Sequence, residues 1–592
     1  MLSRIIYSRL LSGLAFKNLK TMSTALPSVY VRCIPDEERM QISVNYDRGG
    51  GHKAKTFNME RPQQETLSKA LIRLQQNIQK GIFKRNKKKA PKEVVGEIGI
   101  QLLINGDSVE DDLPNNKAWV DGAELHIGDH ILTVGVNLPT VSALSMPSNI
   151  MAGFPIFPRI DVEFADLNKC VFKWVRVARD QTDESHEHGE TSSGISSPNE
   201  ADVQVSCYLV YTPSTDDIGH HLSLTCFPQN ASRTGRELSC VSKVAVDAGP
   251  GVCPFDNRHL YTPSEVGAGC FRVMTYNILA DLYADSDFSR EHLFSYCPHY
   301  ALAIDYRKQL ILKEISGYKA DIICLQEVDR KVFQGCLLPA LDLLDYGGWL
   351  KLKGGEVNEG SATFYRRSKF KLFDQKDVIQ STFLKEDSIN KDIWDVVCLK
   401  PALKEAIEQR TTALQVTVLE SLEHEGRCLC VANTHFYFHP DADNIRIIQA
   451  ILSLRFIHKI CNELAEKGKS VAVVFCGDFN ASPKSGAVEL ITNGSIAADH
   501  CHWKSAIEDR NVQLALSHDL KLVSSCGYPD YTNFTNGFFG TLDYIFSDSA
   551  RLCVDRVIPM PEHAEVTMHV ALPSIVHPSD HIALVCDLKW KD

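Results

Sequence analysis

The sequence lacks any long uninterrupted apolar run. Hydrophobic residues make up 44% of the 592 positions, but they are distributed in short stretches. None of these stretches approaches the ~18 consecutive apolar residues that a transmembrane helix requires. The composition therefore predicts a soluble protein with no membrane partner, long enough for two or three domains with cores of their own.

A strongly basic balance is also missing, because the formal net charge is -11. Proteins that coat nucleic acid non-specifically carry clustered positive charge, so this class of protein is disfavoured. An enzyme that acts on a short anionic substrate with the help of a metal remains compatible with the charge.

The 19 cysteines contain no CxxC pair, and their number is odd. A zinc ribbon or a disulfide framework is therefore disfavoured. Several cysteines, such as Cys324 and Cys476, lie inside apolar runs, which is typical of buried free thiols in a reducing compartment.

Acidic residues are absent from the first 35 positions, where basic residues alternate with apolar and small polar ones. This composition is typical of a mitochondrial transit peptide and predicts one over residues 1–27, with the mature protein in the mitochondrial matrix. The alternative is an ordinary basic tail.

The N-terminal half reads as two modules. Short alternating runs around a helix-like stretch at 63–79 predict a β-rich or α+β module over 28–145. Further strand-like runs predict a β-sandwich-like module over 155–248. A connector rich in glycine and proline follows at 249–268.

The pattern changes at Phe271, where apolar strands begin to alternate with longer helical stretches. A helix predicted over 302–318 precedes a strand over 320–326, and a helix over 444–467 precedes a strand over 470–476. Such alternation predicts an α/β domain, which we assign to 269–592.

Six short polar motifs stand at the ends of apolar runs in this α/β region. They are Thr275-Tyr276-Asn277, Leu325-Gln326-Glu327, Asn433-Thr434-His435, Gly477-Asp478-Phe479-Asn480, Leu542-Asp543-Tyr544 and Ser579-Asp580-His581. A single such motif is most often a cap or a satisfied surface group. Six of them in one domain indicate a site that holds a hard divalent cation and a phosphate.

Glu327 and Asn277 are the first candidates for metal ligands. Glu327 follows an apolar run, so its carboxylate emerges from a buried strand. Mg²⁺ keeps several waters and needs only one or two protein carboxylates. One carboxylate with a neutral carboxamide is therefore sufficient for Mg²⁺, with Mn²⁺ as the alternative.

The remaining motifs supply candidates for the chemistry on phosphorus. Alternation along an extended backbone would aim Asp478 and Asn480 the same way, with Asp478 deprotonating a water and Asn480 bonding a phosphate oxygen. A cationic His581 would stabilise the charged phosphoryl group and needs a carboxylate partner, for which Asp543 is the candidate. Asn433 and His435 complete the candidate catalytic set, in which His435 is a second imidazole for the phosphate.

This ordered set of residues resembles the endonuclease/exonuclease/phosphatase superfamily over essentially 269–592. The resemblance implies a four-layer α/β sandwich for the catalytic domain, beside the β-rich N-terminal region. Within the superfamily the longer strings resemble the deadenylase branch. These strings are Thr275-Tyr276-Asn277-Ile278-Leu279-Ala280, Gly360-Ser361-Ala362-Thr363-Phe364-Tyr365 and Asp543-Tyr544-Ile545-Phe546.

The resemblance implies the same division of roles. Glu327 would be the principal metal ligand, with Asn277 and Asp580 close to the metal and the phosphate. Family deadenylases sandwich a terminal adenine between a proline and a phenylalanine, and the matching positions are Pro440 and Phe538. The alternative for Phe538 is ordinary core packing.

One departure from the family pattern stands beside the proline. Related deadenylases have Trp-Asp there, where this chain has Phe438-His439, so its preference among bases or linkages could differ.

The implied activity is a metal-dependent 3′-end exoribonuclease that releases 5′-AMP from RNA with 3′ adenylates, including poly(A) tails of mitochondrial RNA, and from 2′,5′-linked oligoadenylate. Two alternatives stay open at this point. One keeps the fold and acts as a nocturnin-like 2′-phosphatase on a dinucleotide, and the other is a catalytically inert RNA-binding scaffold. The sequence does not identify a protein partner.

Overall fold

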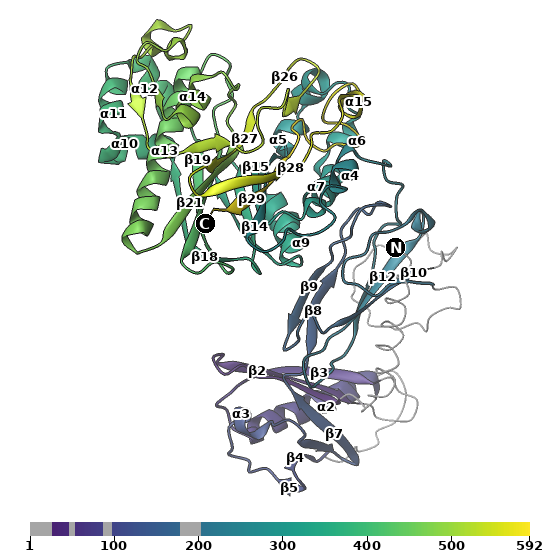
Figure 1. The fold of residues 1–592 in the computed structure, drawn as a ribbon. Coiled ribbons are helices and arrows are strands. Elements are labelled where there is room, and N and C mark those ends of the chain that lie inside the picture. The colour runs from purple at the N-terminus through teal and green to yellow at the C-terminus, as the bar shows by residue number, and fades with distance from the viewer. Residues whose placement is uncertain (1–26, 47–53, 87–97, 178–202, 592) are drawn as a thin grey trace. The chain divides into compact units, whose positions relative to one another are not determined.

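The computed structural model describes residues 27–46, 54–86, 98–177 and 203–591 and forms two compact units (Figure 1). The N-terminal unit comprises Met1–Ser148, Pro158–Tyr211 and Gly219–Ala245, and the C-terminal unit comprises Asn149–Phe157, Thr212–Ile218 and Val246–Asp592. The predicted transit peptide lies outside the described residues, except for its last residue.

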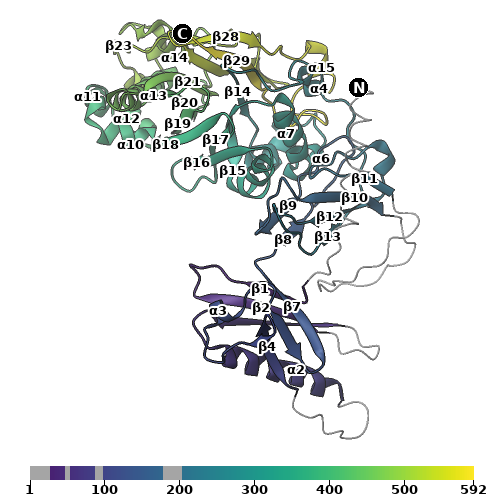
Figure 2. The same cartoon turned by 60° about the horizontal axis from the view of Figure 1, so that its bottom comes forward.

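The N-terminal unit is rich in strands. Its larger sheet has the order β3 (Lys55–Pro62), β2 (Arg39–Tyr46), β1 (Val29–Arg32), β7 (His130–Val136), β6 (Glu124–Ile127), β4 (Ile100–Ile104) and β5 (Asp107–Ser108). Helix α2 (Leu67–Asn86) packs against this sheet (Figure 2). Leu67, Leu71, Leu74 and Ile78 recur along one face of α2 and are buried in the core of the sheet.

A second group of strands follows in the same unit. Four of them form the antiparallel order β11 (Val203–Ser206), β10 (Val171–Val177), β12 (His221–Phe227) and β13 (Leu238–Val241), and β8 (Thr140–Ser145) pairs with β9 (Arg159–Glu163). Side chains that alternate along β10 and β12, namely Trp174, Leu222 and Leu224, are fully buried. The β-rich character predicted for this half is confirmed.

The C-terminal unit contains two six-stranded mixed sheets. The first has the order β16 (Tyr346–Leu352), β17 (Glu359–Arg366), β15 (Ile322–Asp329), β14 (Cys270–Asn277), β29 (Leu584–Trp590) and β28 (Leu552–Val557). The second has the order β18 (Phe370–Ile379), β19 (Ala413–Ser421), β20 (Arg427–His435), β21 (Ser470–Asp478), β27 (Asp543–Asp548) and β24 (Leu522–Ser524).

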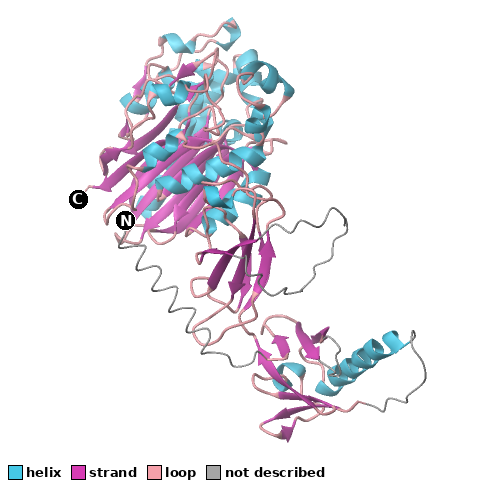
Figure 3. Cartoon of the chain, turned by 90° about the vertical axis from the view of Figure 1, so that its right-hand side faces the viewer, coloured by secondary structure: helices cyan, strands magenta, loops and turns pink. Residues whose placement is uncertain are grey.

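The two sheets pack face to face and are covered by helices on their outer faces (Figure 3). Successive residues of each strand alternate between the two sides. Val474 of β21 belongs to the core between the sheets, whereas its neighbours Val473 and Phe475 belong to the core under the helices. Both faces of the strands are thus buried, which is why the strands read as continuous apolar runs.

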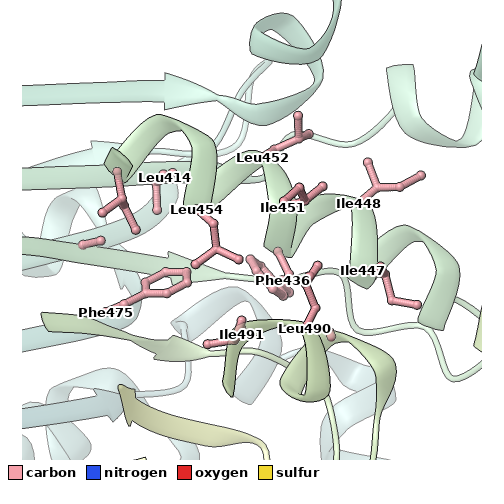
Figure 4. Packing of buried hydrophobic residues seen from close by; sticks show 14 of the residues in the cluster. Leu414, Phe436, Ile447, Ile448, Ile451, Leu452, Leu454, Phe475, Leu490 and Ile491 are labelled. Carbon is pink, nitrogen blue, oxygen red and sulfur yellow. The ribbon is translucent and has the colours of Figure 1, made fainter. Parts of the chain in front are cut away.

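Helix α13 (Asp443–Glu466) shows how the outer layer is held (Figure 4). Its side chains Ile447, Ile451 and Leu454 are buried in the same cluster as Phe475 of β21. Each fully buried aliphatic side chain contributes roughly 1.5–3 kcal/mol. The same layer contains α10 (Gln380–Glu386), α11 (Lys391–Cys398), α12 (Pro401–Glu408) and α14 (Gly486–Asn493).

The first sheet is covered by α4 (Pro254–His259), α7 (Ile304–Tyr318) and α9 (Leu338–Asp342). The order helix, sheet, sheet, helix is the predicted four-layer α/β sandwich, and that prediction is confirmed. The helices predicted at 302–318 and 444–467 correspond to α7 and α13.

Two findings concern the chain as a whole. All 19 cysteines lie among the described residues and are free thiols. In the described part of the chain, no helix combines the length and the hydropathy of a membrane span.

Candidate active site

The six polar motifs lie at one edge of the two sheets. β14 runs parallel to β15, and β20 runs parallel to β21. The C-terminal ends of the two pairs meet, because Asn277 at the end of β14 donates to Asp478 at the end of β21. β27 and β29 run antiparallel to their neighbours and therefore begin at that same edge. Asp478 at the end of β21 is paired with Asp543 at the start of β27.

Glu327 is turned toward this edge by an irregularity in β15. The register between β15 and β17 shifts between Leu325 and Val328, and Glu327 has a left-handed backbone with φ of 55°. Such a bulge redirects a side chain at the cost of about 1–3 kcal/mol of local strain. Glu327 is held there by the backbone N–H of Ala280, which donates to its Oε2 at 2.9 Å.

The carboxamide of Asn277 connects the two sheets. Its Nδ2 donates to Glu327 Oε1 at 2.9 Å and to Asp478 Oδ2 at 3.0 Å. Its Oδ1 accepts from the backbone N–H of Leu279 at 3.0 Å, which fixes the orientation of the amide. Residues from different sheets are thereby brought into one buried site.

Negative charge accumulates around Glu327. Burial raises the pKa of Glu327 to about 6, and the carboxylates of Glu359 and Asp580 add to this effect. Asp580 accepts a hydrogen bond from Asn533 Nδ2 at 2.9 Å through Oδ2, whereas its buried Oδ1 has no hydrogen-bond partner. The positive charge of Lys353 opposes the rise in the pKa of Glu327 only in part.

Asp478 lies between two imidazoles. The distance from its Oδ2 is 3.6 Å both to Nε2 of His435 and to Nε2 of His581. Burial raises the pKa of Asp478 to about 7, and the neighbouring carboxylate of Asp543 adds to the rise. A carboxylate with such a pKa can accept a proton near neutral pH.

The two imidazoles have opposite charge preferences. Although burial opposes the charged form of His581, the carboxylates of Asp543, Asp580 and Asp478 raise its pKa well above the usual value. His581 Nδ1 lies 2.8 Å from Asp543 Oδ2, so the predicted ion pair has the geometry of a hydrogen bond. Burial, helped by Lys353 and His581, lowers the pKa of His435 well below its usual value, so this ring is neutral.

The extended backbone predicted through Asn480 is wrong. β21 ends at Asp478, and Asn480 has a left-handed φ of 48°. The alternation of an extended strand therefore does not apply to this residue. Its Nδ2 donates to the carbonyl of Phe436 at 3.0 Å, and its backbone N–H donates to Asp478 Oδ1 at 2.9 Å.

Asn433 is not brought together with the others. Its Nδ2 donates to the carbonyls of Leu325 and Ala362, each at 3.1 Å, and its Oδ1 accepts from Gln326 Nε2 at 2.9 Å. All of these partners belong to the first sheet. Both ends of its amide are thus engaged in holding the two sheets together.

The two residues matched to adenine stacking lie in exposed loops. Pro440 follows β20, and Phe538 lies in the turn between β25 (Asn533–Phe534) and β26 (Phe539–Gly540). The side chain of Phe538 is 52% exposed, which excludes the core-packing alternative.

Three further residues line the site and were missed by the sequence reasoning. Lys353 Nζ lies 2.5 Å from Glu359 Oε1 and 3.5 Å from His435 Nδ1, and the Tyr283 hydroxyl donates to the same Glu359 oxygen at 3.2 Å. Lys353 directly follows strand β16, and Glu359 is the first residue of strand β17. Their positions at strand ends were the signal that could have revealed them.

The geometry admits a metal ion. Asp478, Asp543 and His581 each present a ligand atom within 4.8 Å of the others, so this buried group could hold a metal. A protonated imidazole has no free lone pair for a metal, however, and the raised pKa of His581 favours that form. A second pair of oxygen donors is Glu327 with Asp580, whose charge helps to raise the pKa of Glu327.

Comparison with known proteins gives two family matches. Residues 274–581 match the endonuclease/exonuclease/phosphatase family, and residues 138–247 match the N-terminal domain of 2′,5′-phosphodiesterase 12-like proteins.

Individual relatives agree with these matches. The chain is 43% identical to 2′,5′-phosphodiesterase 12 of Mus musculus, covering 96% of this chain and 95% of the mouse protein. It is 31% identical to carbon catabolite repressor protein 4 homolog 1 of Arabidopsis thaliana, over 65% of this chain and 70% of that protein. It is 27% identical to the CCR4-Not complex 3′-5′-exoribonuclease subunit Ccr4 of Mycosarcoma maydis, over 54% of this chain and 50% of that protein. The chain belongs to the endonuclease/exonuclease/phosphatase family and, within it, to the family of 2′,5′-phosphodiesterase 12.

Proposed function

We propose that the protein is a Mg²⁺-dependent 3′-end exoribonuclease and phosphodiesterase. Its substrates would be adenylate-rich RNA, including poly(A) tails of mitochondrial RNA, and 2′,5′-linked oligoadenylate, and its product would be 5′-AMP. The observation that carries the proposal is the meeting of Asn277, Glu327, Asp478 and His581 at one buried edge. The names of the mouse relative and of the fungal Ccr4 subunit support the 2′,5′ linkage and the 3′-5′ direction, respectively.

Glu327, Asn277 and Asp580 would hold the metal. Glu327 and Asp580 fit a hard cation because their carboxylates offer oxygen ligands and the buried Asp580 Oδ1 has no other partner, while Asn277 would hold the Glu327 carboxylate through Nδ2. When bound, Mg²⁺, or Mn²⁺ in its place, neutralises charge on the phosphate and polarises it. We prefer this set to Asp478, Asp543 and His581 because the ion pair of His581 with Asp543 occupies the imidazole.

Asp478 would position the attacking water and accept its proton. Its carboxylate is fixed by Asn277 Nδ2 and by the backbone N–H of Asn480, which leaves little freedom of orientation. The side chain of Asn480 would act on the loop after β20 through its bond to Phe436.

The two histidines would face the phosphoryl group from either side of Asp478. His581, held cationic by Asp543, would donate a hydrogen bond to a phosphoryl oxygen as negative charge builds there. Neutral His435 would contribute a second contact, with Lys353 adding positive charge behind it. Asn433 would support this arrangement from between the sheets.

Attack on phosphorus involves the same side chains whichever ribose oxygen leaves. This supports hydrolysis of both 2′,5′ and 3′,5′ linkages. The preference for adenine would come from Pro440 and Phe538, because base stacking contributes roughly 1–3 kcal/mol per base.

The direct test is product analysis. Hexaadenylate with 3′,5′ linkages and triadenylate with 2′,5′ linkages would be incubated with the protein and Mg²⁺, and products separated by anion-exchange chromatography. We expect 5′-AMP from both, no product after chelation of the metal, and recovery when Mg²⁺ is restored. Phosphate release from a dinucleotide 2′-phosphate without 5′-AMP from either oligomer would favour the 2′-phosphatase alternative, and binding without any turnover would favour the scaffold.

The same proposal places the protein in the mitochondrial matrix. It rests on the leader of residues 1–27, which is basic and free of acidic residues. Fusion of these residues to a fluorescent protein should direct it to mitochondria, and diffuse fluorescence outside mitochondria would contradict this placement.

A further inference from the structure

The loop that follows His435 carries a small group of rings that contact one another. The rings of Tyr437 and His439 are stacked, with centroids 6.1 Å apart and an interplanar angle of 17°. These two residues therefore share one side of the loop. The ring of Phe438 lies edge-on to that of Tyr437, with centroids 5.4 Å apart and an interplanar angle of 67°. The ring of Phe438 is 70% exposed.

The backbone of this loop is clamped by a buried arginine. Arg446, at the start of α13, is 4% exposed and donates from Nη1 to the carbonyls of Tyr437 and His439 at 3.0 and 2.7 Å. Its Nη2 donates to the carbonyl of Pro440 at 3.2 Å. Three carbonyls of one loop are thus held by one guanidinium.

Tyr437 and His439 each have a further partner within the protein. The guanidinium of Arg410 lies 4.2 Å from the centre of the Tyr437 ring, and His439 Nδ1 accepts from the backbone N–H of Asp441 at 3.1 Å. Tyr437 is half-buried, whereas His439 is exposed. Phe438 and Pro440 are exposed as well.

The loop is also tied to the reacting groups. The backbone N–H of Phe436 donates to the carbonyl of Asp478 at 2.9 Å. Phe438 stands three residues after His435, a separation that spans at most roughly 11 Å. An exposed apolar ring this close to His435, in a loop whose backbone is held, is suited to stacking on a nucleobase.

We propose that Phe438 stacks on the base of the penultimate nucleotide, the nucleotide whose ribose oxygen leaves when 5′-AMP is released. This inference rests on the proposed function, in which Pro440 contacts the terminal adenine. Phe438 and Pro440 are exposed residues two positions apart in one loop, so neighbouring bases of a strand would meet neighbouring side chains. Stacking of this kind accepts any base, so this subsite favours an oligonucleotide over a substrate with only one base.

The test combines one variant with one altered substrate. The kcat/KM of the wild type and of Phe438→Ala would be measured on hexaadenylate and on the same oligomer with an abasic ribose at the penultimate position. Removing the base should lower wild-type kcat/KM roughly 5- to 150-fold, the range expected for one stacked base. Phe438→Ala should show the same loss on intact hexaadenylate and less than about a twofold further loss on the abasic oligomer, because both changes remove one contact.

Matched variants separate stacking from other effects. Phe438→Trp should retain wild-type kcat/KM. Phe373→Ala removes another exposed aromatic ring, on β18, and should leave both substrates unaffected. The inference would be overturned if Phe438→Ala lowered kcat/KM by the same factor on hexaadenylate and on the abasic oligomer. It would also be overturned if the effect of Phe438→Ala disappeared only when the terminal nucleotide, and not the penultimate one, lacked its base. Release of 5′-AMP from intact hexaadenylate by the wild type supports the proposed function, whatever the result for Phe438→Ala. If the wild type releases no 5′-AMP, both the proposed function and the inference on Phe438 are rejected.

Discussion

Asp478 is the residue on which the two sheets and the two imidazoles converge. Its Oδ2 accepts from Asn277 Nδ2 at 3.0 Å, and a carboxamide oxygen at the same position could keep that bond. Asp478→Asn should therefore fold normally while losing the proton acceptor. We expect kcat on hexaadenylate to fall on the order of 10²–10⁴-fold with little change in KM, measured by steady-state release of 5′-AMP.

The control for this variant is Asp374→Asn, in the edge strand β18. It makes the same chemical change away from the site and should leave kcat within about twofold, since surface substitutions are usually neutral. Activity of Asp478→Asn close to that of the control would remove Asp478 from the role of base.

Glu314 of α7 is a buried carboxyl group outside the site. Its side chain has no exposed surface, its Oε1 accepts from the Tyr318 hydroxyl at 3.3 Å, and its Oε2 has no hydrogen-bond partner. Burial raises its pKa to about 7. Because the folded state binds this proton more tightly than the unfolded chain, the resulting stability is complete below about pH 4 and is lost as the pH rises through about 7.

Glu314→Gln should remove this dependence on pH. The wild type should lose stability between pH 5.0 and pH 8.5 through Glu314, and the variant should not. The difference in free energy of unfolding, variant minus wild type, should therefore be on the order of 2–3 kcal/mol larger at pH 8.5 than at pH 5.0. Urea denaturation of both proteins at the two pH values measures this difference. A constant difference between them would mean that Glu314 does not titrate in this range.

At the scale of elements, the pairing of β20 with β21 sets the distance between His435 and Asp478. Thr434 is the partner of Gly477 in this parallel pair, and His435 is the partner of Asp478. A Cβ added to Gly477 would lie 2.2 Å from the carbonyl oxygen of Thr434. The two strands can lie this close only because position 477 has no side chain.

Gly477→Ala should force these strands apart where the site is built. We expect a loss of roughly 1–3 kcal/mol in free energy of unfolding, as for other overpacked positions, together with a fall in kcat. Gly335→Ala is the matched control, because a Cβ there meets no atom within 4 Å. Should Gly477→Ala keep full stability and kcat, the close approach of the strands would not be what positions Asp478.

Element positions were predictable from the sequence because burial on both faces leaves continuous apolar runs. Helices α7 and α13 and the strands that follow them were found within a few residues. The polar residues at strand ends were predictable for the same reason, since a buried strand can expose a carboxylate only where it ends. These two regularities located the edge of the sheets that carries the site.

Side-chain direction was not predictable in the same way. Glu327 and Asn480 both have left-handed backbones, a conformation that no hydrophobic pattern reveals. Asn433 stands beside His435 in sequence, yet its amide lies between the sheets and serves their packing. The position of Lys353 at a strand end could have marked it as a candidate, but its contact with His435 depends on β16 and β20 belonging to facing sheets, and no local pattern reveals that partner.

At the scale of the whole molecule, the chain enters the C-terminal unit before its main body begins. Asn149–Phe157 and Thr212–Ile218 belong to this unit, although both precede Val246. Met151 and Phe154 are buried in the core under the first sheet, and Lys313 Nζ lies 4.6 Å above the ring of Phe154. The segment is joined to the main body by the backbone N–H of Ala152, which donates to the carbonyl of Asp247 at 2.9 Å.

Shortened chains should therefore differ in stability according to whether they keep this segment. A chain of residues 138–592 retains it, and its C-terminal unit should unfold at the same denaturant concentration as in the full chain. A chain of residues 246–592 loses the side chains of Met151 and Phe154 and should unfold at a lower concentration. Phe154→Ala in the full chain isolates the effect and should cost roughly 3–5 kcal/mol. If residues 246–592 alone matched the full chain in denaturant unfolding and in kcat, the segment Asn149–Phe157 would not stabilise the C-terminal unit.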